Sequence, residues 1–323
     1  MSDTKQRITV RPIHSVTRRT FCRTALVAGS GIALPASNEN AIASPEPQLQ
    51  RIAAFSKPLQ PLSFDELADT VAALGFDGIE GTIRKGGHIE PERVEDDLPK
   101  MVDALRKRDL EIIVMASSVN NLTDPYSEKT LRTAAKVGIK KYRMAYYRYD
   151  LNRPIAAQLE AIRPALDDLV ALNRELGLTA LYQNHSGSRT VGAPIWDIYS
   201  LIKDYDSQDV AIALDTAHTT IEGGLCWPIH YNLARPHLGA LYVKDFGWKG
   251  RRVDWRPLGE GHLATQLFQE VIKSGFSGPI SLHVEYLDRN QPDSVDKHVT
   301  AFRRDLKTLR SWIQKASTAN EDG

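Results

Sequence analysis

The sequence predicts an α/β fold, a single-domain (β/α)8 or TIM barrel, and three observations support this prediction. Eight short runs rich in β-forming residues recur at a spacing of roughly 30 residues, and amphipathic stretches separate them. No second linker or low-complexity segment interrupts the repeat. A closed parallel barrel requires this alternation because each helix crosses back over the outside of the barrel. The eight runs begin near Ile52, Phe76, Leu110, Ile139, Leu178, Val210, Leu238 and Pro279.

The predicted helices between these runs carry start and stop signals. Ser63 precedes a stretch with early acidic residues, an apolar stripe runs from Leu67 to Leu74, and Gly75 ends it. Similar apolar spacing covers residues 155–176 and 295–313. A doubly wound open sheet is the competing architecture. It usually carries a phosphate-binding glycine turn after an early strand, and no such turn is visible.

The first 43 residues resemble a twin-arginine (Tat) signal peptide. Arg18 and Arg19 precede Phe21, an uncharged stretch covers residues 24–37, and residues 41–43 form the small-x-small pattern that a signal peptidase accepts. The apolar run of about a dozen residues is too short to span a bilayer core of roughly 30 Å, so we expect no stable membrane anchor. The Tat translocase is the expected partner during export, and the periplasm or the exterior is the expected location.

The chain is therefore expected to have four parts. They are a signal peptide at 1–43, a linker at 44–50, the barrel at 51–316 and a disordered tail at 317–323.

Composition limits the classes of partner. The 323 residues are 42% hydrophobic and 25% charged, which is typical of an ordinary globular protein. Removing the signal takes six basic and two acidic residues from the 41 and 40 of the whole chain, which leaves a net charge of about −3. Such a charge gives no general attraction to phosphate backbones, so nucleic acid is not expected as a partner. Cys226 is the single cysteine after cleavage, which excludes an intrachain disulfide.

Alternation along the strands predicts which side chains enter the barrel. In Val210-Ala211-Ile212-Ala213-Leu214-Asp215 the bulky residues should pack on helices, so Asp215 should point into the barrel mouth. The same argument on the neighbouring strands places several polar residues inside: Gln183 and His185, Tyr242 and Lys244, and Ser281, His283 and Glu285. Burying these groups without partners would cost several kcal/mol each, so they pair with one another or bind a ligand.

Four motifs carry a resemblance to a known family, the xylose isomerase-like barrels, often called sugar phosphate isomerases/epimerases. The motifs are Leu214-Asp215-Thr216-Ala217-His218, Tyr242-Val243-Lys244-Asp245, Pro257-Leu258-Gly259-Glu260-Gly261 and Val284-Glu285-Tyr286. The resemblance implies a divalent metal (Mn, Mg, Co or Zn) held by Glu, Asp, His and Glu on the fifth to eighth strands. It places two of these ligands on Asp215 and Glu285.

The other two ligand positions depart from the family pattern. Gln183 replaces the strand-five Glu, and Tyr242 replaces the strand-seven His, so one negative charge and one neutral nitrogen ligand are lost. With His218 or His185 the remaining oxygens can still bind a cation. In the alternative, Lys244 replaces the metal, neutralises Asp215 and Glu285 and stabilises an enediolate.

Further residues are expected at the substrate. Arg84 and His88 follow the second strand in a glycine-containing turn and can meet a substrate carboxylate or hydroxyls; Gln183, Tyr242 and Trp248 complete the expected substrate-binding set. Aromatic residues near the same rim, Tyr146, Tyr147, Tyr149, Trp227 and Trp248, suit stacking against a sugar.

The leading functional hypothesis is an exported sugar, keto-sugar or glycoside isomerase, epimerase or lyase. Glu285 or His185 would abstract a proton next to a carbonyl, and a metal or Lys244 would stabilise the enediolate. The main alternative is a metal-free carbohydrate-binding barrel, which Gln183 and Tyr242 favour. A metal-dependent DNA-repair endonuclease needs many more His and Glu ligands and a basic groove, which the sequence does not offer.

Overall fold

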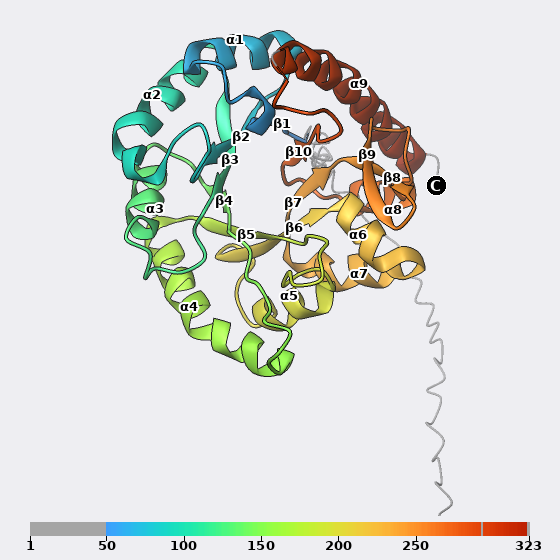
Figure 1. The fold of residues 1–323 in the computed structure, drawn as a ribbon. Helices are drawn as coiled ribbons and strands as arrows, with labels where there is room; N and C mark the ends of the chain where they lie inside the picture. Colours follow the sequence, from blue (N-terminus) through green and yellow to red (C-terminus); the bar gives the residue numbers. More distant parts are fainter. Residues whose placement is uncertain (1–49, 292, 322–323) are drawn as a thin grey trace, which may run out of the picture. The chain divides into compact units, whose positions relative to one another are not determined.

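The computed structural model describes residues 50–291 and 293–321, and within them the chain forms a closed eight-stranded parallel barrel surrounded by helices (Figure 1). All eight strands begin within two residues of the predicted positions. The strands of the barrel are β1 (Ile52–Phe55), β2 (Gly78–Ile83), β3 (Glu111–Ser117), β4 (Lys141–Arg143), β5 (Thr179–Gln183), β6 (Val210–Asp215), β7 (Leu238–Val243) and β10 (Ile280–Leu282).

The barrel closes between its first and last strands. β1 pairs in parallel with both β2 and β10, with Ala53 opposite Gly78 on one side and Ser281 on the other. The remaining strands follow in chain order around the ring, so every parallel strand has two neighbours. All the carboxyl ends of the strands therefore lie at one mouth of the barrel.

The predicted orientation of the strand residues is confirmed. Val210, Ile212 and Leu214 pack in the large apolar cluster between strands and helices. Ala211 and Ala213 belong to a separate cluster inside the barrel, whose members are Ala53, Ile113, Val114, Leu181, Ala211, Ala213, Ala240 and Tyr242. Four alanines in this inner cluster leave room for large polar side chains above them.

The helices pack around the outside of the strands. α1 begins with a capping box, in which Ser63 and Glu66 exchange hydrogen bonds, and ends at Gly75 with φ of 82°, as the sequence predicts. The helices are α1 (Phe64–Leu74), α2 (Val94–Arg106), α3 (Ser127–Lys136), α4 (Ile155–Leu176), α5 (Ile195–Ile202), α6 (Thr216–Gly223), α7 (Trp227–Ala234), α8 (Thr265–Lys273) and α9 (Ser294–Glu321).

One boundary differs from the prediction. Residues 317–321, expected as the start of a disordered tail, continue α9. The side-chain hydroxyls of Ser317 and Thr318 donate to the backbone carbonyls of Ile313 and Gln314, so both polar side chains are accommodated within the helix. The predicted signal peptide and all but the last residue of the linker lie outside the described residues. Among the described helices none is long and apolar enough to cross a membrane.

An antiparallel hairpin that the sequence analysis did not identify follows β7. It consists of β8 (Asp245–Lys249) and β9 (Arg252–Arg256). Buried Asp245 anchors it, because its carboxylate accepts backbone N–H bonds from four residues: Phe246, Gly259, Gly261 and Leu263. A Cβ atom at Gly261 would collide with this carboxylate, which explains the glycine in the Pro257–Gly261 motif.

Replacing Asp245 by Asn should therefore loosen the hairpin. An amide has one acceptor oxygen instead of two and would turn its NH2 group toward backbone donors, so we expect D245N to lower the free energy of unfolding by about 2–4 kcal/mol. Urea denaturation followed by circular dichroism measures the change. The matched control is D168N at an exposed position of α4, and equal stability of the two variants would contradict the anchoring role.

Candidate active site

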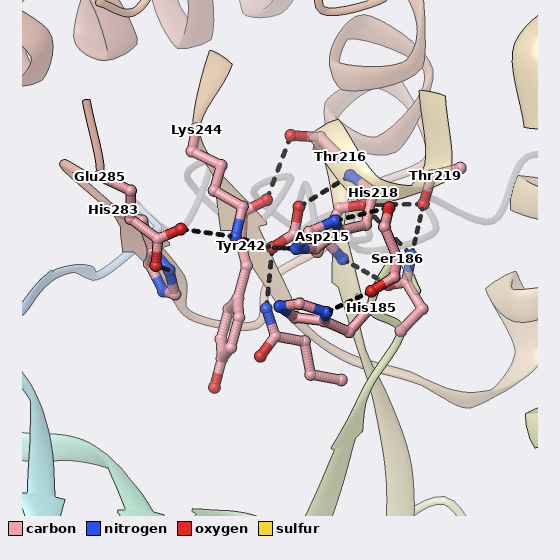
Figure 2. Close-up of polar contacts among 12 residues, drawn as sticks. His185, Ser186, Asp215, Thr216, His218, Thr219, Tyr242, Lys244, His283 and Glu285 are labelled. Atoms are coloured by element: carbon pink, nitrogen blue, oxygen red, sulfur yellow. Dashed lines mark hydrogen bonds and ion pairs between the residues drawn. The ribbon is translucent and has the colours of Figure 1, made fainter. Parts of the chain in front are cut away.

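The ammonium of Lys244 lies between two carboxylates at the barrel mouth. Its Nζ is 3.1 Å from Oδ2 of Asp215 and 3.3 Å from Oε2 of Glu285 (Figure 2). Asp215 ends β6, Lys244 follows β7, and Glu285 follows β10. Asp215 and Lys244 are buried, whereas the Glu285 side chain is 25% exposed and reaches the opening. The three residues that the sequence predicts at one site are thus brought together.

Local structure holds Asp215 in place. It is the N-cap of α6, where its Oδ1 accepts the backbone N–H of His218. Its Oδ2 accepts a 2.8 Å bond from the side-chain amide of Gln183, and its backbone N–H donates to Asn184. The protein alone, through the junction of β6 and α6, therefore fixes the direction of the Asp215 carboxylate.

The charges of this triad stabilise one another. Burial disfavours the carboxylate of Asp215, but His218 and Lys244 outweigh burial and lower its pKa to about 2. Burial also opposes the charge of Glu285, yet Lys244 and His283 hold its pKa well below the ordinary value. For Lys244 burial again opposes the charge, and the two carboxylates raise its pKa above the ordinary value. All three groups are ionised at neutral pH.

Two residues that the sequence analysis missed complete the site from the other side of the barrel. Glu80 on β2 is fully buried and lies 3.3 Å from the guanidinium of Arg143 on β4. The side chain of Arg143 donates a 2.6 Å bond to Oε1 of Gln183. Alternation within β2 and β4 offered a signal for both, since each is a charged residue inside a short buried strand.

These contacts form a closed polar ring around the inside of the barrel. His283 closes it, because its Nε2 bonds to Glu80 at 2.8 Å and its Nδ1 lies 3.9 Å from Glu285. Burial disfavours a charge on His283, but Glu80 and Glu285 raise its pKa. In order around the barrel the ring is Glu80, Arg143, Gln183, Asp215, Lys244, Glu285 and His283.

Two histidines stand beside the triad. His185 donates from Nδ1 to the carbonyl oxygen of Ser186 at 2.9 Å, and its ring lies 4.0 Å from that of His218. Burial and Lys244 lower the pKa of His185, so at neutral pH its Nε2 carries no proton. The Nδ1 of His218 pairs with the Ser186 hydroxyl, and its Nε2, 3.8 Å from Asp215, has no hydrogen-bond partner among the described residues.

The two residues expected at the substrate from the turn after β2, Arg84 and His88, differ in their contacts. Arg84 points to the mouth, with its guanidinium 5.9 Å from the ring of Phe55. His88 instead supports its own loop, because it contacts Thr82 and the carbonyl of Leu59 through its two nitrogens.

Two tryptophans lie on the hairpin of β8 and β9: Trp248, which was expected at the substrate, and Trp255, which was not. Trp248 packs edge-on against Phe246 on the hairpin and is 48% exposed. Trp255 on β9 lies beside the triad, with its ring centroid 4.7 Å from Lys244 Nζ.

A cluster of polar side chains at the carboxyl ends of the strands is typical of (β/α)8 barrels whose functional site lies at that end. The chain matches the family model described as "Xylose isomerase-like TIM barrel" over residues 68–312 and belongs to that family. This finding confirms the resemblance that the four sequence motifs carry.

Solved structures share the fold at low sequence identity. The E. coli 3-keto-D-glucoside 4-epimerase YcjR is 17% identical, covers 81% of this chain and 99% of its own, and superposes with a TM-score of 0.62. A D-tagatose 3-epimerase-like protein is 13% identical over 84% of this chain and 99% of its own, with a TM-score of 0.63. The IOLI protein, solved with a bound zinc atom, is 15% identical over 83% of this chain and 99% of its own, with a TM-score of 0.65. No curated protein sequence matches the chain.

The four-ligand metal centre that the family implies does not fit the donor atoms of this chain. Gln183 turns its NH2 to Asp215 and its oxygen to Arg143; both partners dictate this orientation, since the carboxylate accepts and the guanidinium donates. The ring of Tyr242 points away from Asp215 and Glu285 (Figure 2). Lys244 occupies the space between the two remaining carboxylates. Among the described residues no group of three or more His, Cys, Asp or Glu side chains could hold a metal ion.

Removing the ammonium should destabilise the barrel. K244M would leave Asp215 and Glu285 as buried carboxylates without their cation, and we expect a loss of about 3–5 kcal/mol in the free energy of unfolding. The matched control is K203M, which removes a lysine from an exposed ion pair and should have little effect. Urea unfolding of both variants is the measurement. Equal midpoints for the two would show that the ammonium is not the counter-charge of the site.

Proposed function

We propose that this protein is an isomerase or epimerase of sugars that moves a proton at a carbon next to a carbonyl. The observation that supports it most is the ammonium of Lys244, fixed between Asp215 and Glu285 beside a cavity. The cavity has a volume of about 250 Å³, and Glu285 and Trp255 line it. This is near the lower end of small-molecule pockets, roughly 300–1,000 Å³, which suits a ligand of monosaccharide size.

Lys244 is the electrophile in this proposal. An ammonium has three N–H donors, and Asp215 and Glu285 take two of them. The third has no acceptor among the described residues and is available for a substrate carbonyl oxygen. A fixed positive charge at that oxygen stabilises the enediolate formed when the neighbouring carbon loses its proton. Lys244 thereby supplies, without a metal, the charge stabilisation that the family resemblance assigns to a divalent ion.

His185 and Glu285 are the proposed proton-transfer groups. The Nε2 of His185 is unprotonated at neutral pH and free to accept a proton, because Nδ1 already donates to Ser186. Glu285 is ionised and reaches the opening of the site. The two come from different strands, and a pair of bases is suited to removing a proton and returning it at a different position or face of the sugar.

The substrate class and the location complete the proposal. The structural neighbours include a 3-keto-D-glucoside 4-epimerase, a D-tagatose 3-epimerase-like protein and an L-ribulose 3-epimerase, which supports a carbohydrate with a carbonyl group. Trp255 offers a ring for stacking against such a sugar. The Arg18-Arg19 motif and the residues after it support export through the Tat translocase to the periplasm or beyond.

A metal-free carbohydrate-binding barrel is the second candidate. Gln183 and Tyr242 favour it, since both replace metal ligands of the family and neither presents a ligand atom to the triad. Binding alone gives no proton exchange with solvent, which separates the two candidates.

Hydrogen exchange in D2O tests the proposal without knowledge of the product. With D-fructose, D-tagatose or a 3-keto-D-glucoside we expect the proton signal next to the carbonyl to disappear in an NMR time course. H185Q or E285Q should slow the exchange by about 10²–10⁴-fold, because each removes a proton-transfer group. The control is H230Q on α7, which should exchange at the wild-type rate. Absence of exchange on every keto sugar would favour the binding barrel.

Treatment with a chelator tests the role of Lys244 separately. Because Lys244 occupies the place between the carboxylates, we expect the exchange rate to be unchanged after prolonged dialysis against EDTA and after addition of Mn²⁺, Mg²⁺, Co²⁺ or Zn²⁺. The rate is measured by the same NMR time course. A loss that one metal restores would show that a metal supplies the positive charge and would contradict the proposal for Lys244.

A further inference from the structure

The cavity beside the triad has two cations on its outer wall. Lys57 comes from the 3-10 turn η1 (Lys57–Leu59) after β1, and Arg289 comes from the loop after β10. They line the same cavity as Glu285 and Trp255. Neither belongs to the polar ring, and the proposed proton transfer uses neither of them.

These cations lack carboxylate partners among the described residues. Lys57 makes no ion pair and no side-chain hydrogen bond there, and Arg289 donates only to the amide oxygen of Gln60. Asp288 also lines the cavity, but its carboxylate accepts bonds from Asn290 and Gln291 in its own turn. By contrast, the cations inside the barrel, such as Lys244, have carboxylates as neighbours.

A third cation without an ion pair lies near the same cavity. Arg84 reaches toward Phe55, a residue of the cavity wall, and likewise has no ion pair among the described residues. Burial lowers the pKa of Lys57; Glu285 opposes that shift, while Arg289 and Arg84 add to it. Like charges gathered at a partly buried opening repel one another, and a bound anion relieves this repulsion.

We infer that the substrate is a negatively charged sugar, whose anionic group binds Lys57 and Arg289 while its carbonyl lies at Lys244. The inference rests on the proposed function and makes its substrate class specific. Lysine and arginine both bind carboxylates and phosphates through charge-assisted hydrogen bonds, so a sugar acid and a sugar phosphate share the required chemistry.

Isothermal titration calorimetry with three probes tests the inference. We expect D-glucuronate or D-glucose 6-phosphate to bind wild-type protein at least about tenfold more tightly than neutral D-glucose, and this preference should shrink as salt is raised. The tighter of the two anions identifies the source of the charge. Equal affinities for the anions and glucose would overturn the inference.

Matched variants assign the preference to the two residues. K57Q and R289Q should each weaken anion binding by roughly tenfold to a hundredfold and leave glucose binding unchanged. The controls are K107Q and R303Q, at the C-cap of α2 and on α9. Both residues are exposed cations without ion pairs among the described residues, and both variants should bind all probes like wild type. If the cavity variants behave like these controls, the inference fails.

The same protein preparations separate this inference from the proposed function. Keto sugars that exchange hydrogen in D2O, with no charge-dependent binding, would overturn the anion site and leave the proposed function intact. Anion binding that depends on Lys57 and Arg289, without exchange on any keto sugar, neutral or anionic, would support the anion site and overturn the proposed chemistry.

Discussion

The buried ammonium of Lys244 is the constraint on which the rest of the site depends. Two carboxylates, Asp215 and Glu285, converge on the mouth of the barrel from different strands, and without a cation between them their burial would be unfavourable. Lys244 provides the cation from the strand that lies between them. The remaining members of the polar ring, Gln183 and His283, each contact one charge of this triad and one of the pair Glu80 and Arg143.

The ring also explains the composition of the barrel interior below it. Four alanines on three strands, β1, β6 and β7, occupy little space in that layer, so that Tyr242 and Arg143 fit inside. The Arg143 guanidinium lies 6.0 Å from the Tyr242 ring centroid. Tyr242 and Gln183, at the two positions where the family resemblance would place a His and a Glu, both lie next to Arg143. The amide of Gln183 joins Arg143 to Asp215, a connection that a carboxylate could not make to Asp215 without repulsion.

Much of this arrangement could be predicted from sequence, because alternation of large and small residues reports the direction of a side chain directly. It placed Asp215, Lys244 and Glu285 inside correctly. Glu80 and Arg143 obey the same rule, but β4 is only three residues long and gives little pattern to read. Trp255 could not be placed, since its position depends on an antiparallel hairpin whose anchor, Asp245, acts through backbone groups. Pairing partners across the barrel likewise depend on tertiary contacts.

The division between paired and unpaired charges separates what the fold requires from what a ligand requires. Inside the barrel each buried charge has an opposite charge nearby, and its free energy is accounted for within the protein. At the rim, Lys57 and Arg84 are partly buried and make no ion pair among the described residues, and burial lowers the pKa of each. A fold alone gives no reason to hold cations there. Their position next to Glu285 and Lys244 is therefore best explained by a ligand whose charge is opposite to theirs.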